Sequence, residues 1–114
     1  VDLAVDARLK AVLGAIAPDA GWLSEETADD PARLACRAMW CVDPIDGTRD
    51  FVRGRPGWAV SVALVVDGAP QLGVLYAPAR DELWIAQAGR GATRNGLDLV
   101  ASQRPVFPGA RVPA

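Results

Sequence analysis

Short runs of β-forming residues, separated by turn-forming residues, constrain the fold of this chain more than any other feature. Residues 58–66 and 72–76 are rich in Val and Leu, and an Asp-Gly-Ala-Pro turn sequence joins them. A further short run follows at 82–86, and Asn95-Gly96 stands between two more. Asp-Gly and Asn-Gly dipeptides readily adopt the positive φ angles that tight turns between antiparallel strands require. The pattern predicts a meander of antiparallel strands.

A helix is expected ahead of these strands. Apolar residues recur at helical spacing between residues 7 and 17, and Pro18 ends that pattern. Asp6 stands where a helix N-cap belongs. A buried strand is expected at 38–42, stopping at Asp43-Pro44. The fold class predicted is therefore α+β, with a helix packed on an antiparallel β-meander.

The composition excludes several kinds of site and partner. The sequence contains no histidine, which rules out a Ser-His-Asp triad and any zinc site with a His ligand in these residues. A net charge of −2 without runs of like charge argues against a nucleic-acid or membrane-surface partner. No apolar stretch approaches the roughly 20 residues that span a bilayer, and the start carries no signal-peptide pattern. We therefore expect a cytoplasmic location.

Two carboxylates lie three residues apart at the end of the expected strand at 38–42. Pro44 restricts Asp43 to an extended conformation, so Asp43, Asp46 and the Ile45 carbonyl can converge on one point. Oxygen ligands of this kind suit Mg²⁺ before Ca²⁺. The alternative is that both acids only form a turn in a proline-containing loop.

An anion site is expected directly after this acidic pair. Gly47 lets the backbone approach a ligand closely, and Thr48 offers a hydroxyl and a backbone N–H. A cation site beside an anion site is what an enzyme that processes phosphate esters requires.

Several motifs resemble those of one family in the same order. Residues 40–51, Trp-Cys-Val-Asp-Pro-Ile-Asp-Gly-Thr-Arg-Asp-Phe, resemble the W-x-(V/I)-D-P-(I/L)-D-G-T-x-x-F signature of the inositol monophosphatase family of Mg²⁺-dependent, lithium-sensitive phosphatases. Residues 23–27, Leu-Ser-Glu-Glu-Thr, are similar to its acidic motif, and residues 3–6 are similar to a segment ending T-x-A-D, with Leu3 replacing the threonine. Its strand and hairpin order is matched at 60–64, 73–78 and 91–96.

This resemblance implies a larger architecture. The chain would be the N-terminal half of an αβαβα sandwich. Residues 1–104 would form a metal- and phosphate-binding α+β portion, and residues 105–114 would begin the connection to a C-terminal half. In the family, that half supplies a further metal-binding aspartate, which nothing in residues 102–114 matches.

The resemblance also implies site residues. Two or three Mg²⁺ ions, replaceable by Mn²⁺, would be held by Glu25, Asp43, Asp46 and the Ile45 carbonyl, with Asp43 bridging two ions. The phosphate would be met by Asp43, Gly47 and Thr48. Catalysis would involve the Thr48 hydroxyl, oriented by Asp6, together with Glu25.

The implied function is that of a phosphomonoesterase of inositol monophosphatase type. It would hydrolyse a small phosphorylated substrate by metal-activated water, in a homodimer. One alternative is a 3′(2′),5′-bisphosphate nucleotidase of the same family, which residues 23–26 favour, whereas residues 43–45 favour an inositol phosphatase. An alternative of another class is a non-catalytic binding or assembly module with an incomplete metal site.

Overall fold

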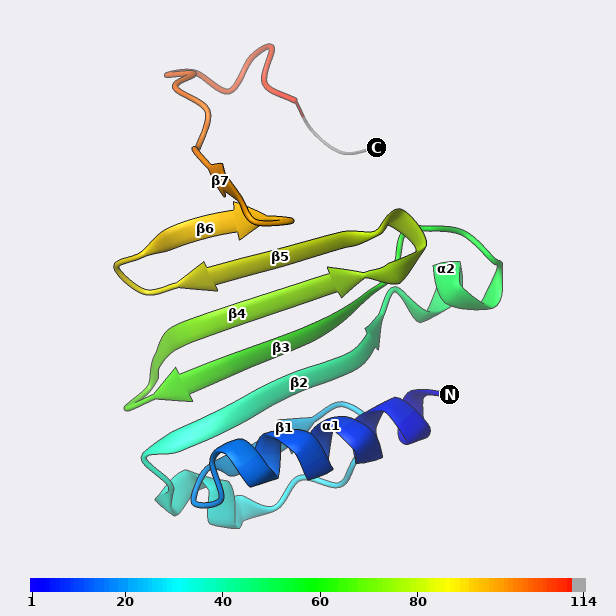
Figure 1. Cartoon of the computed structure of the whole chain (residues 1–114), viewed down its shortest axis with the longest axis vertical. Coiled ribbons are helices and arrows are strands. Elements are labelled where there is room, and N and C mark those ends of the chain that lie inside the picture. The colour runs from blue at the N-terminus through cyan, green and yellow to red at the C-terminus, as the bar shows by residue number, and fades with distance from the viewer. Residues whose placement is uncertain (112–114) are drawn as a thin grey trace.

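The computed structural model describes residues 1–111 of the chain. One long helix, α1 (Asp2–Ile16), precedes a single seven-stranded sheet whose strands lie side by side in chain order (Figure 1). The strands are β1 (Gly21–Ser24), β2 (Ala38–Asp46), β3 (Ala59–Val66), β4 (Ala69–Ala77), β5 (Glu82–Gln87), β6 (Gly91–Arg94) and β7 (Leu97–Leu99). The shorter helical segments are η1 (Pro31–Ala35), α2 (Thr48–Val52) and η2 (Pro78–Arg80). The predicted α+β class is confirmed.

The sheet is antiparallel from β2 to β7, as predicted, but β1 pairs with β2 in parallel. This first strand was not predicted, because residues 21–24 show only a short apolar segment. In a parallel pair, the connection must run from the C-terminal end of the first strand back to the N-terminal end of the second. Here residues 25–37, which contain η1, provide it.

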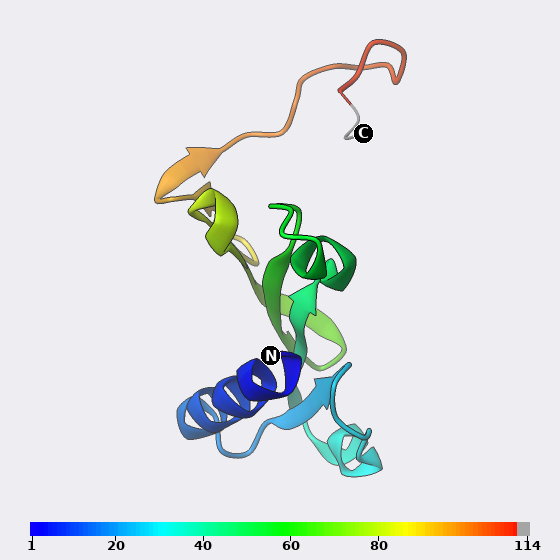
Figure 2. The same ribbon diagram turned by 90° about the vertical axis from the view of Figure 1, so that its right-hand side faces the viewer.

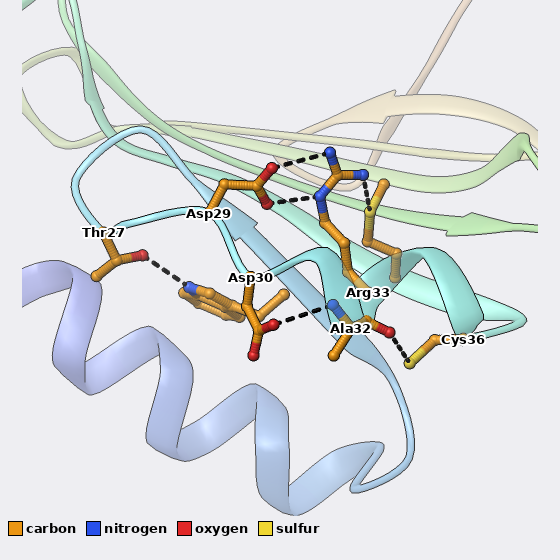
Figure 3. A network of polar contacts seen from close by, with 8 residues as sticks. Thr27, Asp29, Asp30, Ala32, Arg33 and Cys36 are labelled. Atoms are coloured by element: carbon orange, nitrogen blue, oxygen red, sulfur yellow. Dashed lines mark hydrogen bonds and ion pairs between the residues drawn. The ribbon is translucent and has the colours of Figure 1, made fainter.

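Polar contacts hold that connection in place (Figure 3). The Arg33 guanidinium donates to both carboxylate oxygens of Asp29, from Nε at 2.7 Å and from an Nη atom at 3.2 Å. Asp30 caps η1 by accepting from the backbone N–H of Ala32 at 3.0 Å. Arg33 also lies against Gly21, where a Cβ would come within 2.9 Å of the arginine Cβ. The connection is therefore packed directly on the start of β1.

The helix α1 begins five residues earlier than predicted. It runs from Asp2 to Ile16 and ends before Pro18, as expected. The interpretation of Asp6 as an N-cap is wrong, because Asp6 lies inside the helix and turns toward the sheet, where it is 2% exposed. Within residues 1–111, no helix combines the length and the apolar character needed to cross a membrane.

The core gathers on β2. The buried hydrophobic residues are Trp40, Val42 and Ile45, together with the fully buried Pro44. α1 lies across one face of the sheet at this end, as Figures 1 and 2 show. The expectation that the strand stops at Asp43 is wrong: β2 continues to Asp46. Pro44 is tolerated within the strand because the pairing with β3 is interrupted there.

Tight turns join the antiparallel strands that follow β2. Both predicted hairpins form, with positive φ at Asp67 and Gly68 and at Asn95 and Gly96. The Asn95 side chain also accepts from the Leu83 N–H at 2.7 Å, which ties this turn to β5. Of the expected connection at 105–114, residues 105–111 carry no helix or strand, and residues 112–114 lie outside the described part.

Candidate metal and phosphate site

A β-bulge at the end of β2 brings two carboxylates to one face of the sheet. In a regular strand, residues three apart point to opposite faces. Here Asp43 pairs with Ser61 and Asp46 pairs with Ala59, so three steps on β2 match two steps on β3. Ser61 and Ala59 share a face, and the bulge therefore places Asp43 and Asp46 on that same face.

Glu25 reaches this face from the neighbouring strand. β1 ends at Ser24, which pairs with Val42, and Glu25 follows directly at the level of Asp43. A hollow of about 350 Å³ opens on this side of the sheet, and its lining includes Glu25, Cys41, Asp43, Ser61 and Ala63. Two of the predicted metal ligands thus border the same hollow.

The surroundings of the Asp43 side chain disfavour its charged carboxylate form. Burial raises the pKa of its carboxyl above the usual value, and the nearby charges of Glu25 and Asp46 raise it further. The backbone N–H of Ile45 acts in the opposite direction, and Glu26 adds a smaller repulsion. One carboxylate oxygen of Asp43, Oδ1, is buried without a hydrogen-bond partner. A bound cation would satisfy that oxygen and remove the repulsion.

The donor set fits a hard divalent cation, although it does not form a complete cage. Among residues 1–111, no group of three carboxylate or thiol side chains is arranged to hold a metal ion by itself. Mg²⁺ does not need one, since it usually keeps several waters and binds through one or two carboxylates plus substrate phosphates. Asp43 and its acidic neighbours can supply that share.

The backbone after β2 is shaped for close approach. Gly47 has a φ of 86°, and a Cβ at this position would lie 2.7 Å from the carbonyl oxygen of Gly57. Gly47 also caps α2, because its carbonyl accepts from the N–H groups of Asp50 and Phe51 at 2.9 and 3.1 Å. The N–H of Thr48, at the start of the helix, has no acceptor within it. It can therefore meet an anion.

Thr48 and Asp6 have other partners than the sequence analysis expects. The Thr48 hydroxyl donates to the Ile45 carbonyl at 3.1 Å, and the Asp6 carboxylate accepts a hydrogen bond from Ser24. A carbonyl oxygen has two lone pairs, so Ile45 can accept this bond and still face a cation. The contact between Asp6 and Thr48 stays a prediction.

Sequence reasoning missed three residues around this site. Ser24 joins Asp6 to the acidic segment, and no sequence pattern distinguishes it from other serines near a motif. Arg80 and Glu82, which precede and begin β5, line a second hollow of about 310 Å³ beside Asp46 and Gly47. Only the sheet register, which pairs Ala77 with Glu82, brings them near the site.

A third hollow, of about 340 Å³, lies over β3 to β6 and is lined mainly by apolar and small side chains such as Leu75, Trp84 and Ala92. It contains no carboxylate. The chemistry therefore gathers at the end of β2 rather than over the centre of the sheet.

Curated proteins of known sequence are similar to this chain over part of their length. The chain is 45% identical over 91 residues to a histidinol-phosphatase of Mycobacterium tuberculosis, a match that covers 80% of the chain and 34% of that protein. It spans about a third of the length of this curated relative.

Solved structures share the fold. The extragenic suppressor protein suhB of Bartonella henselae is 35% identical with a TM-score of 0.84, over 90% of this chain and 40% of that one. An IMPase/NADP phosphatase complexed with Mg²⁺ and phosphate is 28% identical with a TM-score of 0.79, over 86% of this chain and 37% of that one. The model of the inositol monophosphatase family matches residues 1–113, and the chain belongs to that family.

Proposed function

We propose that the protein is a Mg²⁺-dependent phosphomonoesterase whose metal and phosphate site is built at the end of β2. The observation that carries the proposal is the buried Asp43 Oδ1, which lacks a hydrogen-bond partner and faces the charges of Glu25 and Asp46. The similar IMPase/NADP phosphatase, complexed with Mg²⁺ and phosphate, supports this choice of ion.

The carboxylates of Glu25, Asp43 and Asp46, with the Ile45 carbonyl, are the proposed ligands. A bound divalent cation neutralises phosphate oxygens and lowers the pKa of water at the site. We propose two or three such ions, with Mn²⁺ as a substitute, and Asp43, whose pKa both other acids raise, would be shared by two of them. Remaining coordination positions are left for water, for the substrate and for residues beyond this chain.

The residues after the bulge handle the phosphate. The backbone N–H groups of Gly47 and Thr48 donate to phosphate oxygens, since the first N–H groups of a helix attract anions. The Thr48 hydroxyl would orient the attacking water for in-line displacement, and a Glu25 carboxylate oxygen would accept a proton of that water. As the water oxygen bonds to phosphorus, the bond from phosphorus to the ester oxygen breaks, and the alcohol leaves with a proton from solvent. Asp6 is the proposed partner that orients the Thr48 hydroxyl.

Two substrate classes are supported by specific observations. The Asp-Pro-Ile-Asp-Gly-Thr sequence at 43–48 favours an inositol monophosphate. The relative that is 45% identical bears the name histidinol-phosphatase, which makes histidinol phosphate the second candidate. Both are small phosphomonoesters, and we propose that a cytoplasmic homodimer hydrolyses one of them.

The test is phosphate release by the complete gene product with Mg²⁺. Inositol 1-phosphate, histidinol phosphate and adenosine 3′,5′-bisphosphate are compared side by side, with and without lithium. We expect Mg²⁺-dependent, lithium-sensitive turnover of one of the first two. Preference for the nucleotide would select the bisphosphate nucleotidase instead. Folded protein that binds neither Mg²⁺ nor Mn²⁺ would contradict the proposal and favour a non-catalytic module.

A further inference from the structure

A buried hydrogen-bonded pair joins α1 to the residue that precedes Glu25. Asp6 is 2% exposed and Ser24 is 6% exposed. The Ser24 hydroxyl donates to the Asp6 carboxylate and accepts from the backbone N–H of Glu26 at 3.2 Å. Ser24 is thus fixed by a charge-assisted bond on one side, and it fixes the following turn on the other.

Because side chains alternate between the two faces of a β-strand, fixing Ser24 also limits the direction in which Glu25 can point. Ser24 pairs with Val42, which shares a face with Val62 because the two residues pair across β2 and β3. Val62 lines the groove beneath α1, so Ser24 lies on the helix-covered face. Successive residues of an extended strand point to opposite faces. Holding Ser24 on the α1 side therefore directs Glu25 to the side that carries Asp43.

The acidic segment needs such an anchor because its charges repel. Glu25 follows Ser24 at the level of Asp43 on the neighbouring strand, and the bulge in β2 places Asp46 on the same face as Asp43. Without a cation, repulsion favours conformations in which the exposed Glu25 turns away. A fixed Ser24 limits those conformations and keeps the ligand oriented before the ion arrives.

We propose that Asp6 and Ser24 are positioning residues that hold Glu25 toward Asp43 and so raise the affinity of the site for a divalent cation. Neither contacts the ion or the substrate. This inference deepens the proposed function and depends on it. It also gives Asp6 a part that does not require contact with Thr48.

The test measures Mn²⁺ affinity by calorimetric titration of the complete gene product. Ser24→Ala removes the hydroxyl and should weaken Mn²⁺ binding by about 10- to 100-fold, the range found for outer partners of metal ligands. Ser24→Thr keeps a hydroxyl and should restore most of the affinity. At saturating Mg²⁺ the Ala variant should keep kcat, with the loss expressed in the Mg²⁺ concentration needed for half-maximal rate.

Ser102→Ala is the matched control. The Ser102 hydroxyl also accepts from the N–H two residues ahead, that of Arg104 at 3.2 Å, but it is exposed and remote from the acids. Its loss should leave Mn²⁺ affinity unchanged. Equal weakening by the two Ala substitutions, or unchanged affinity in a folded Ser24→Ala protein, would overturn the inference.

Asp6→Asn covers the case in which Ser24→Ala does not fold. Asparagine keeps the size and an acceptor oxygen but loses the charge that strengthens the bond to Ser24. We expect a folded variant with affinity reduced several-fold, and unchanged affinity would overturn the inference. If the unsubstituted protein binds no Mn²⁺, the proposed function fails; if it binds while every variant binds equally, only the positioning role fails.

Discussion

The two ends of the sheet differ in how their strands are held. At the end formed by α1, β1 and β2, Trp40, Val42 and Ile45 are at most 5% exposed, and even the polar Asp6 is buried. At the other end, large apolar residues of β5 to β7 are 38% exposed or more, as at Leu83, Ile85, Leu97 and Leu99. The first end is held by packing, and the second by strand pairing and tight turns.

The difference explains where the chemistry lies. Burial removes water from a carboxylate and disfavours its charged form, and nearby like charges add to this; Asp43 meets both conditions next to the buried residues of β2. Asp98 on β7, in contrast, is exposed. The proposed metal site therefore lies at the packed end, where the sheet can hold repelling carboxylates in place.

The largest expected effect on stability comes from the glycine between the bulge and α2. Gly47→Ala should cost about 2–4 kcal/mol of unfolding free energy, because it combines an unfavourable positive φ with a Cβ placed 2.7 Å from the Gly57 carbonyl oxygen. Chemical denaturation of the protein measures the loss.

Gly54→Ala sharpens this prediction. Gly54 also has a positive φ, of 67°, but a Cβ there would meet nothing within 4 Å. Only the cost of the positive φ remains, so the expected loss of unfolding free energy falls to about 1 kcal/mol. Equal losses for both variants would show that the close approach of Gly57 does not constrain the packed end.

Burial on β2 is tested by a pair of identical substitutions. Val42 is 3% exposed and Val100, which follows β7, is 84% exposed. Val42→Ala should destabilise the protein by about 1–3 kcal/mol through lost burial and a cavity. Val100→Ala should stay within about 0.5 kcal/mol of the unsubstituted protein. Similar unfolding free energies for the two variants would remove the contrast between the ends.

The charge of Asp43 is expected to have a smaller effect on the stability of the metal-free protein. Its pKa is raised in the folded state, so the folded protein binds this proton more readily than the unfolded chain does. Above the raised pKa, ionisation of Asp43 therefore lowers the free energy of unfolding. This loss decreases as pH falls through the raised pKa, and it is gone below the ordinary value of 3.8. Asp43→Asn should make metal-free protein more stable at about pH 7, with an advantage that vanishes near about pH 3.

Denaturation in the presence of a chelator, at a series of pH values, checks that sign. Saturating Mn²⁺ should reverse the order, because an ion that binds only the folded state stabilises it and the Asn variant lacks a ligand. An Asn variant that is less stable than the unsubstituted protein at neutral pH without metal would contradict the assigned environment of Asp43.

Local signals predicted much of the fold. The Asn95-Gly96 and Asp67-Gly68 dipeptides themselves favour the positive φ angles of tight turns, so both hairpins formed as expected. The acidic pair at Asp43 and Asp46 was also visible, since carboxylates around a proline at the end of an apolar run form a short pattern.

Features that depend on pairing between distant residues could not be predicted. The bulge in β2 appears only when its register against β3 is known, and that register decides which face Asp46 occupies. The hydrogen bond between Asp6 and Ser24 was missed for the same reason, because the two residues lie 18 positions apart on different elements. β1 itself is too short to be distinguished from a loop by periodicity.

The most direct measurement of the central claim compares Mn²⁺ binding and phosphate release for the complete gene product and its Asp46→Asn and Asp98→Asn variants. Asp46→Asn is nearly isosteric, so the fold should be kept while hydrolysis falls by at least about 100-fold, the scale of a lost metal contribution of several kcal/mol. Asp98→Asn, an exposed change of the same chemistry on β7, should retain both binding and turnover. Full Mn²⁺ binding and full activity in the Asp46→Asn protein would contradict the account.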